Sequence, residues 1–170
     1  MHCDAGIYAA ESYIGLPEVG VGLLPAGGGV KELALRASNK FFEGDVKIPT
    51  LLDHFKTIAT ATISTSAHEA YNLGFLEEGR DHVCCNVQRN IGEAKKKVLQ
   101  ISFNYVPPSI RNDIEVLGRT GLSVLYSAIN EFHLGGYMSD YDVVIARQIA
   151  SIITGGDLTS PQKVTEKYLL

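Results

Sequence analysis

Apolar residues recur at helical spacing along most of the chain, and the stretches between them carry residues that start or stop helices. Behind a run of glycines, residues 30–37 show this spacing, and residues 49–60 place their large apolar side chains on one face. Further amphipathic helices are expected at these places: 67–73, 87–99, from Leu122 to Gly135-Gly136, from Ser139 to Gly155-Gly156, and 164–170. The pattern therefore predicts a chain dominated by helices.

Capping residues define where two of these expected helices begin. Ser66 followed by Glu69 forms a capping-box pattern, and Gly74 is suited to a left-handed helix stop. Ser139 and Asp142 repeat the box pattern before the next to last helix. We therefore expect both helices to begin directly after their serines.

The first half of the chain is expected to alternate short extended segments with turns, beginning near Gly6. Residues 6–10 and 12–14 carry the small, β-branched and aromatic side chains that suit extended backbone. Together with the helical pattern, this predicts an α/β chain with a few short strands followed by a mainly helical C-terminal part. We expect a division at residue 110, with 1–110 forming a core and 111–170 a helical region of the same or an appended domain.

Glu18 is the most unusual candidate for chemistry, because it is the one charged residue within the apolar and glycine-rich stretch 13–29. If apolar neighbours such as Val19 and Leu23 remove it from water, the anion is disfavoured and proton transfer near neutral pH is favoured. Alternatively, Pro17 opens a helical turn and Glu18 complements the positive end of its dipole while pointing at water. Residue types alone leave both interpretations open.

The glycines at 27–29 precede an expected helix. Their backbone N–H groups could meet a phosphate, a carbonyl oxygen or an ordered water at the helix N-terminus. Equally, they could let the helix enter close against a sheet. The run is followed by no GK[ST] and contains no GxGxxG, so nucleotide-binding loops of those two kinds are excluded.

Charge and composition exclude several classes of protein. The formal net charge of -4 gives no basic footprint for nucleic acid, and the apolar stretches are too short to span a bilayer. Three cysteines, two of them adjacent at 84 and 85, argue against a secreted disulfide framework and for a reducing, cytoplasmic compartment. His82 with these cysteines lacks a fourth metal ligand, so no metal site is expected.

Other catalytic arrangements find no support. The sequence has no GxSxG elbow, and no histidine is placed beside a nucleophile by a known motif. A glycosidase needs two carboxylates in one cleft, and Glu18 has no evident partner in the sequence.

The segment 9–19, together with 25–29, resembles the central signature of the crotonase superfamily of enoyl-CoA hydratases and isomerases. Segments 65–76 and 135–142 are similar to one subgroup, the long hydratase domain that bacteria fuse behind a 3-hydroxyacyl-CoA dehydrogenase. The similarity covers nearly the whole chain.

This resemblance implies a truncated crotonase (ClpP/crotonase-like) fold in a protein of fatty-acid β-oxidation. Glu18 corresponds to the second of two glutamates that hold a water, and the first would lie a few residues before Met1. The resemblance also implies substrate and water contacts at five positions: Leu16, Pro25, Ala26, Gly27 and Gly28.

Several expectations about partners follow from the resemblance. A coenzyme A thioester would be the substrate, this chain would bind no cofactor, and NAD would belong to an upstream domain. Because the oxyanion donors and one glutamate would be missing, the isolated chain should be inactive. We also expect a homo-oligomer, no nucleic-acid partner and no membrane span.

Two alternatives remain at this stage. An isomerase of the same superfamily would move the double bond with one carboxylate. A second hypothesis is not enzymatic and treats residues 111–170 as an assembly or docking module.

Overall fold

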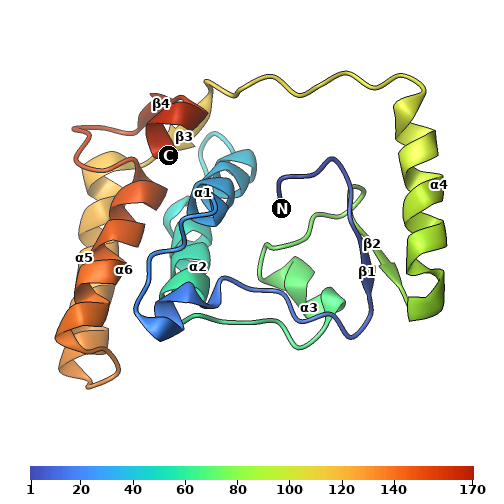
Figure 1. Cartoon of the computed structure of the whole chain (residues 1–170). Helices are drawn as coiled ribbons and strands as arrows, with labels where there is room; N and C mark the ends of the chain where they lie inside the picture. The colour runs from blue at the N-terminus through green and yellow to red at the C-terminus, as the bar shows by residue number, and fades with distance from the viewer. The chain divides into compact units, whose positions relative to one another are not determined.

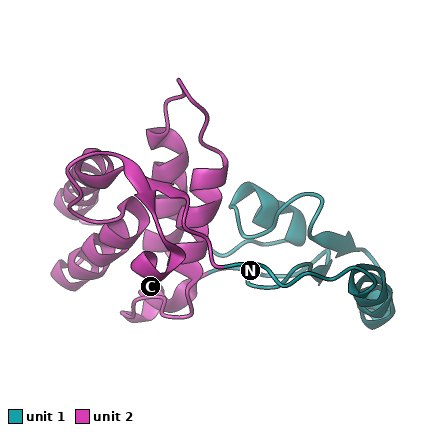
Figure 2. Cartoon of the chain, turned by 90° about the horizontal axis from the view of Figure 1, so that it is seen from above, with its two compact units in different colours: residues 1–15, 63–109 teal, residues 16–62, 110–170 magenta.

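The computed structural model describes all residues from 1 to 170, and they form two compact units (Figure 2). We call residues 1–15 and 63–109 the small unit, and residues 16–62 and 110–170 the large unit. The chain enters the large unit for the second time at Ile110. The functional division expected at residue 110 stays a prediction.

The large unit holds most of the helices of the chain (Figure 1). In chain order its elements are η1 (Pro17–Val21), α1 (Gly29–Asn39), α2 (Ile48–Ala59), β3 (Ile114–Val116), α5 (Gly118–Leu134), α6 (Asp140–Thr154), β4 (Gln162–Val164) and η3 (Glu166–Leu169). Here η denotes a 3₁₀ turn.

The core of the large unit lies where α1, α2, α5 and α6 meet. α5 and α6 pack along each other, while α1 and α2 pack against α6 and against one another. The side chains that are almost fully buried include Leu33, Phe55, Ile58, Leu125, Ile129, Ile149 and Ile153. Apart from Ile153, these are apolar positions of the predicted helices. On α6 the prediction was wrong in part, because Val144 was expected on the buried face and is 53% exposed, whereas Ile153 is buried.

α6 shows how local residues fix a helix. The Ser139 hydroxyl accepts from the Asp142 backbone N–H, and the Asp142 carboxylate accepts in return from the Ser139 backbone N–H. Gly155 ends the helix with a left-handed φ of 76°, and a Cβ there would lie 2.5 Å from the Val116 side chain. The capping box and the glycine stop predicted for this helix are confirmed.

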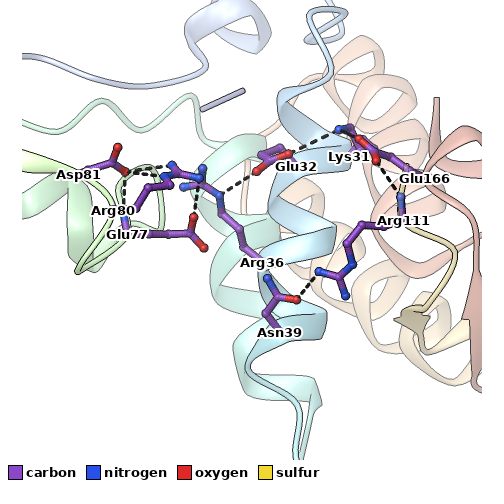
Figure 3. A network of polar contacts seen from close by, with 9 residues as sticks. All are labelled: Lys31, Glu32, Arg36, Asn39, Glu77, Arg80, Asp81, Arg111 and Glu166. Carbon is purple, nitrogen blue, oxygen red and sulfur yellow. Dashed lines mark hydrogen bonds and ion pairs between the residues drawn. The ribbon is translucent and has the colours of Figure 1, made fainter. Parts of the chain in front are cut away.

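A chain of polar contacts crosses α1 of the large unit (Figure 3). Lys31 is paired with Glu166 and with Glu32, and Glu32 also accepts from Arg36 at 3.3 Å. Since Lys31 and Arg36 are only 5% and 2% exposed, these carboxylates satisfy charges that would be costly to bury alone. Arg111 Nη1 donates to Asn39 Oδ1 at 2.7 Å, which links the segment before β3 to the last residue of α1.

The small unit contains two strands and two helices. Its elements are β1 (Ile7–Ala9), α3 (Ala67–Asn72), β2 (His82–Cys84), η2 (Val87–Arg89) and α4 (Asn90–Ser102). β1 and β2 pair in parallel, with Tyr8 opposite Val83. α4 packs on β1 and η2.

The Asp81 side chain hydrogen-bonds to backbone groups that lie just before the two strands of the small unit. Its carboxylate accepts from the backbone N–H groups of Gly6 and Glu77, each at 2.9 Å, and from Arg80 at 2.9 Å. Arg80 is in turn paired with Glu77 at 2.6 Å (Figure 3). This one buried carboxylate therefore joins β1 to the loop before β2.

Several local predictions were wrong. Residues 12–14 form no strand, and residues 164–170 form the end of β4 and the turn η3 instead of a helix. β3 was not predicted at all. At α3, Ser66 caps as expected, but the Glu69 carboxylate bonds to Thr65 rather than to the Ser66 backbone. None of the helices is both long and apolar enough to cross a bilayer.

Candidate functional site

Glu18 lies in the 3₁₀ turn η1, which begins at Pro17. The turn is closed by two backbone hydrogen bonds of 3.0 Å, from Gly22 N–H to the Val19 carbonyl and from Leu23 N–H to the Glu18 carbonyl. Gly22 has a φ of 77°, which a glycine adopts without strain. The proline start and the glycine end therefore hold Glu18 in a fixed backbone position.

The Glu18 carboxylate is partly removed from solvent. Its Oε2 atom is buried and has no hydrogen-bond partner in the protein. This differs from the alternative in which Glu18 only complements the turn dipole and points at water. The apolar neighbours were expected to shield Glu18 from water. Of these, Val19 is buried, but Val21 and Leu23 are 76% and 60% exposed.

Leu16 ties this turn to the start of α1. A Cβ built on Gly29 would lie 2.7 Å from Leu16 Cδ2, so the leucine side chain rests directly on the glycine. Gly29 is therefore closely packed, but against a leucine side chain and not against a sheet as the alternative interpretation expected. The contact also means that two of the predicted regions, the turn of Glu18 and the glycine run, lie side by side in the large unit.

The remaining predicted site residues line the approach to α1. Pro25 is buried, whereas Ala26 and Gly27 are exposed. Gly28 precedes α1 with a φ of 80°, and no side chain caps the helix. The first residues of α1, Gly29 to Lys31, are buried, and a bound group at this helix start stays a prediction.

A cavity of about 400 Å³ adjoins the same turn and was not foreseen. It is lined by Val19, Gly20, Ala59, Thr60, Ala61, Phe132, Tyr137, Met138 and Asp142. The lining comes from η1, the end of α2 and the connection between α5 and α6, so no single segment indicates it. The local features near the cavity are Ala61, which has a φ of 50°, and the adjacent glycines at 135 and 136.

The structure shows no cluster of three or more His, Cys, Asp or Glu side chains that could hold a metal ion. His82 Nε2 lies 3.0 Å from Lys97 Nζ, and the Cys84 thiol donates to the Asn86 carbonyl. Cys3, Cys84 and Cys85 are all free thiols.

The chain is similar to a protein of Bacillus subtilis (strain 168) described as "Probable 3-hydroxyacyl-CoA dehydrogenase". The two are 35% identical over 162 residues, which is 95% of this chain and 20% of the relative. No model of a known protein family matches the chain, and no solved structure does. The chain therefore has a homologue along nearly its whole length, and it spans about a fifth of that relative.

Proposed function

We propose that this chain forms part of a trans-2-enoyl-CoA hydratase domain in a fatty-acid β-oxidation enzyme related to 3-hydroxyacyl-CoA dehydrogenases. Two findings support the metabolic setting: the similarity to the Bacillus subtilis protein and the crotonase-like segments 9–19 and 25–29. A crotonase-like fold for the complete domain is part of this proposal. The substrate is then a coenzyme A thioester, and any NAD binds elsewhere in the longer protein.

The observation that carries the proposal is the buried, unpartnered Oε2 atom of Glu18. Buried polar atoms in folded proteins are almost always hydrogen-bonded, so an exception calls for an explanation. A carboxylate oxygen without a protein partner is free to bind a water or to exchange a proton with a substrate. The rigid turn η1 would hold that oxygen in place during the reaction.

In the proposed reaction, the hydroxyl of water bonds to the β-carbon of the enoyl thioester and a proton bonds to the α-carbon. Glu18 transfers the proton, and the water supplies both the hydroxyl and the replacement proton. Leu16 and Pro25 would shape the site, while the backbone at Ala26, Gly27 and Gly28 would contact substrate or water. The net change is the addition of one water.

The resemblance assigns the oxyanion donors and a second glutamate to residues outside this chain. Loss of one such donor lowers a rate by about two to three orders of magnitude. We therefore expect the isolated chain to be inactive toward enoyl thioesters.

The test is a chimera in which this chain replaces the matched 162 residues of the Bacillus subtilis relative. Hydration is followed by the loss of enoyl-thioester absorbance. Glu18→Gln should lower the rate by about 10² to 10⁴, because it removes a general acid–base group. Glu43→Gln changes an exposed glutamate of the same unit and should leave the rate unchanged.

A fully active Glu18→Gln chimera would exclude Glu18 as the proton-transferring group. Product analysis separates the hydratase from the isomerase alternative, since the first yields a hydroxyacyl thioester and the second a shifted enoyl thioester.

A further inference from the structure

We propose that α4 and the strands β1 and β2 form a docking surface for a polypeptide segment outside these 170 residues. That segment contributes at least one β-strand and an apolar face with an acidic rim. The proposal rests on the proposed function only for the choice of partner in the test.

The first observation is that α4 has no buried residue along its 13 positions. Ile91 and Val98 lie seven residues apart on one face and are 85% and 58% exposed, and Leu99 beside them is 63% exposed. Phe103, which follows the helix, is 87% exposed. Covering such side chains stabilises a complex by about 1.5–3 kcal/mol each, so this face favours association.

The second observation concerns the strands beneath α4. β1 and β2 have three residues each and pair only with one another. None of the six strand residues is buried, although parallel sheets are normally covered on both faces. β2 pairs on one side only, with β1, so its other side is an outer edge at which a further strand can add.

The third observation is a concavity of about 590 Å³ between β2 and α4. Its lining is partly apolar, from Ile7 and Val83, and partly basic, from Arg89, Lys96 and Lys97. Glu93 accepts from Arg89 at 3.0 Å and from Lys96 at 3.1 Å, whereas Lys97 lies against His82, so the lining holds three cations and one carboxylate. The excess positive charge favours a partner with acidic residues around its apolar face.

The charge also argues against two copies of this chain pairing through this same face, since two basic rims would repel one another. The Bacillus subtilis relative offers a different source. This chain covers 20% of it, which leaves the other 80% as polypeptide with no counterpart among these residues. We therefore assign the surface to a segment of that remaining part.

Hydrogen exchange tests this assignment in the isolated chain and in the chimera described above. In the chimera, the amides of α4 and β1 should exchange at least about tenfold more slowly than in the isolated chain. The dehydrogenase reaction named for the relative reports whether the chimera is folded. Equal exchange of α4 in both proteins would overturn the proposal.

Two leucine variants provide the matched comparison. Leu99→Asp places a charge on α4, and Leu134→Asp places one at an 86% exposed site on α5. Only Leu99→Asp should restore fast exchange of α4 in the chimera, and neither should change the isolated chain. If both behave alike, the surface has been assigned wrongly.

Sedimentation of the isolated chain measures whether it self-associates, which is the remaining outcome. Slowing of α4 exchange as this chain self-associates would assign the face to a second copy and overturn the proposal. Exchange is measured without substrate, so a chimera that protects α4 but does not hydrate enoyl thioesters contradicts only the proposed function.

Discussion

The two units treat their amphipathic helices in opposite ways. In the large unit, α6 buries Ile145, Ile149 and Ile153 against its neighbours, whereas α4 of the small unit leaves Ile91 and Val98 in solvent. The two helices have similar lengths and similar apolar spacing. The difference teaches that an apolar stripe identifies the face of a helix that can pack against other segments. Whether that face is buried depends on which segments lie beside it.

The largest effect should come from the core of the large unit. Phe55→Ala removes a side chain that is 3% exposed, and it should lower the free energy of unfolding by about 3–5 kcal/mol. Phe42→Ala, at a phenylalanine that is 70% exposed, should change it by less than about 0.5 kcal/mol. Urea unfolding followed by circular dichroism measures both. Equal effects would mean that the large unit does not hold its own core.

Asp81 offers the corresponding test in the small unit. Asp81→Ala leaves two backbone N–H groups and the Arg80 guanidinium without their acceptor, which should cost about 3 kcal/mol. Hydrogen exchange should show the loss at β1 and β2 and little change in α6. Asp53→Ala, at an exposed site on α2, is the control and should alter neither unit.

The same carboxylate predicts a pH dependence. Burial acts to raise the pKa of Asp81, but the Arg80 guanidinium and the backbone N–H groups of Glu77 and Gly6 outweigh it and hold the pKa below its ordinary 3.8. The folded state therefore binds this proton less readily than the unfolded state. Its stabilising contribution is present above pH 3.8 and is lost as the pH falls through the lowered pKa. Protection of β1 in Asp81→Ala should lack this acid-dependent step.

A smaller effect is expected at the start of α6. Ser139→Ala removes the hydroxyl that accepts from the Asp142 N–H, and it should cost about 1 kcal/mol. It should also raise the pKa of Asp142, because the Ser139 hydroxyl and N–H lower that pKa. Ser127→Ala, in the middle of α5, removes only a bond to a helix carbonyl and should be nearly neutral. Thermal unfolding distinguishes the two variants.

The smallest effect is expected on α4 of the isolated chain. Ile91→Ala should change stability by less than about 0.5 kcal/mol, since the side chain is 85% exposed. A loss of 2 kcal/mol or more would show that α4 is already covered within this chain, and the contrast between the units would disappear.

The sequence predicted those parts of the fold that are set by neighbouring residues. The caps at Ser66 and Ser139 and the glycine stops at Gly74 and Gly155 act within a few positions, so their motifs identify them. β3 and β4 escaped prediction because each has three residues and forms only through the pairing of Ile114 with Val164. Three residues are too few to show the alternation of a strand.

The candidate site was predictable to a similar degree. Pro17 indicated the turn that carries Glu18, and the glycines indicated the start of α1. The cavity beside Val19 depends on residues brought together from distant parts of the chain. Such surroundings arise from tertiary packing, which local patterns do not contain.

The contact of Leu16 with Gly29 makes these two positions mutually dependent. A larger residue at 29 would push the leucine away and carry the turn of Glu18 with it, because a Cβ there lies within 3 Å of both leucine methyl groups. A smaller residue at 16 would relieve the collision. Substitutions here should therefore show epistasis, in which a change that displaces the carboxylate by itself becomes tolerable when its neighbour changes in the opposite sense.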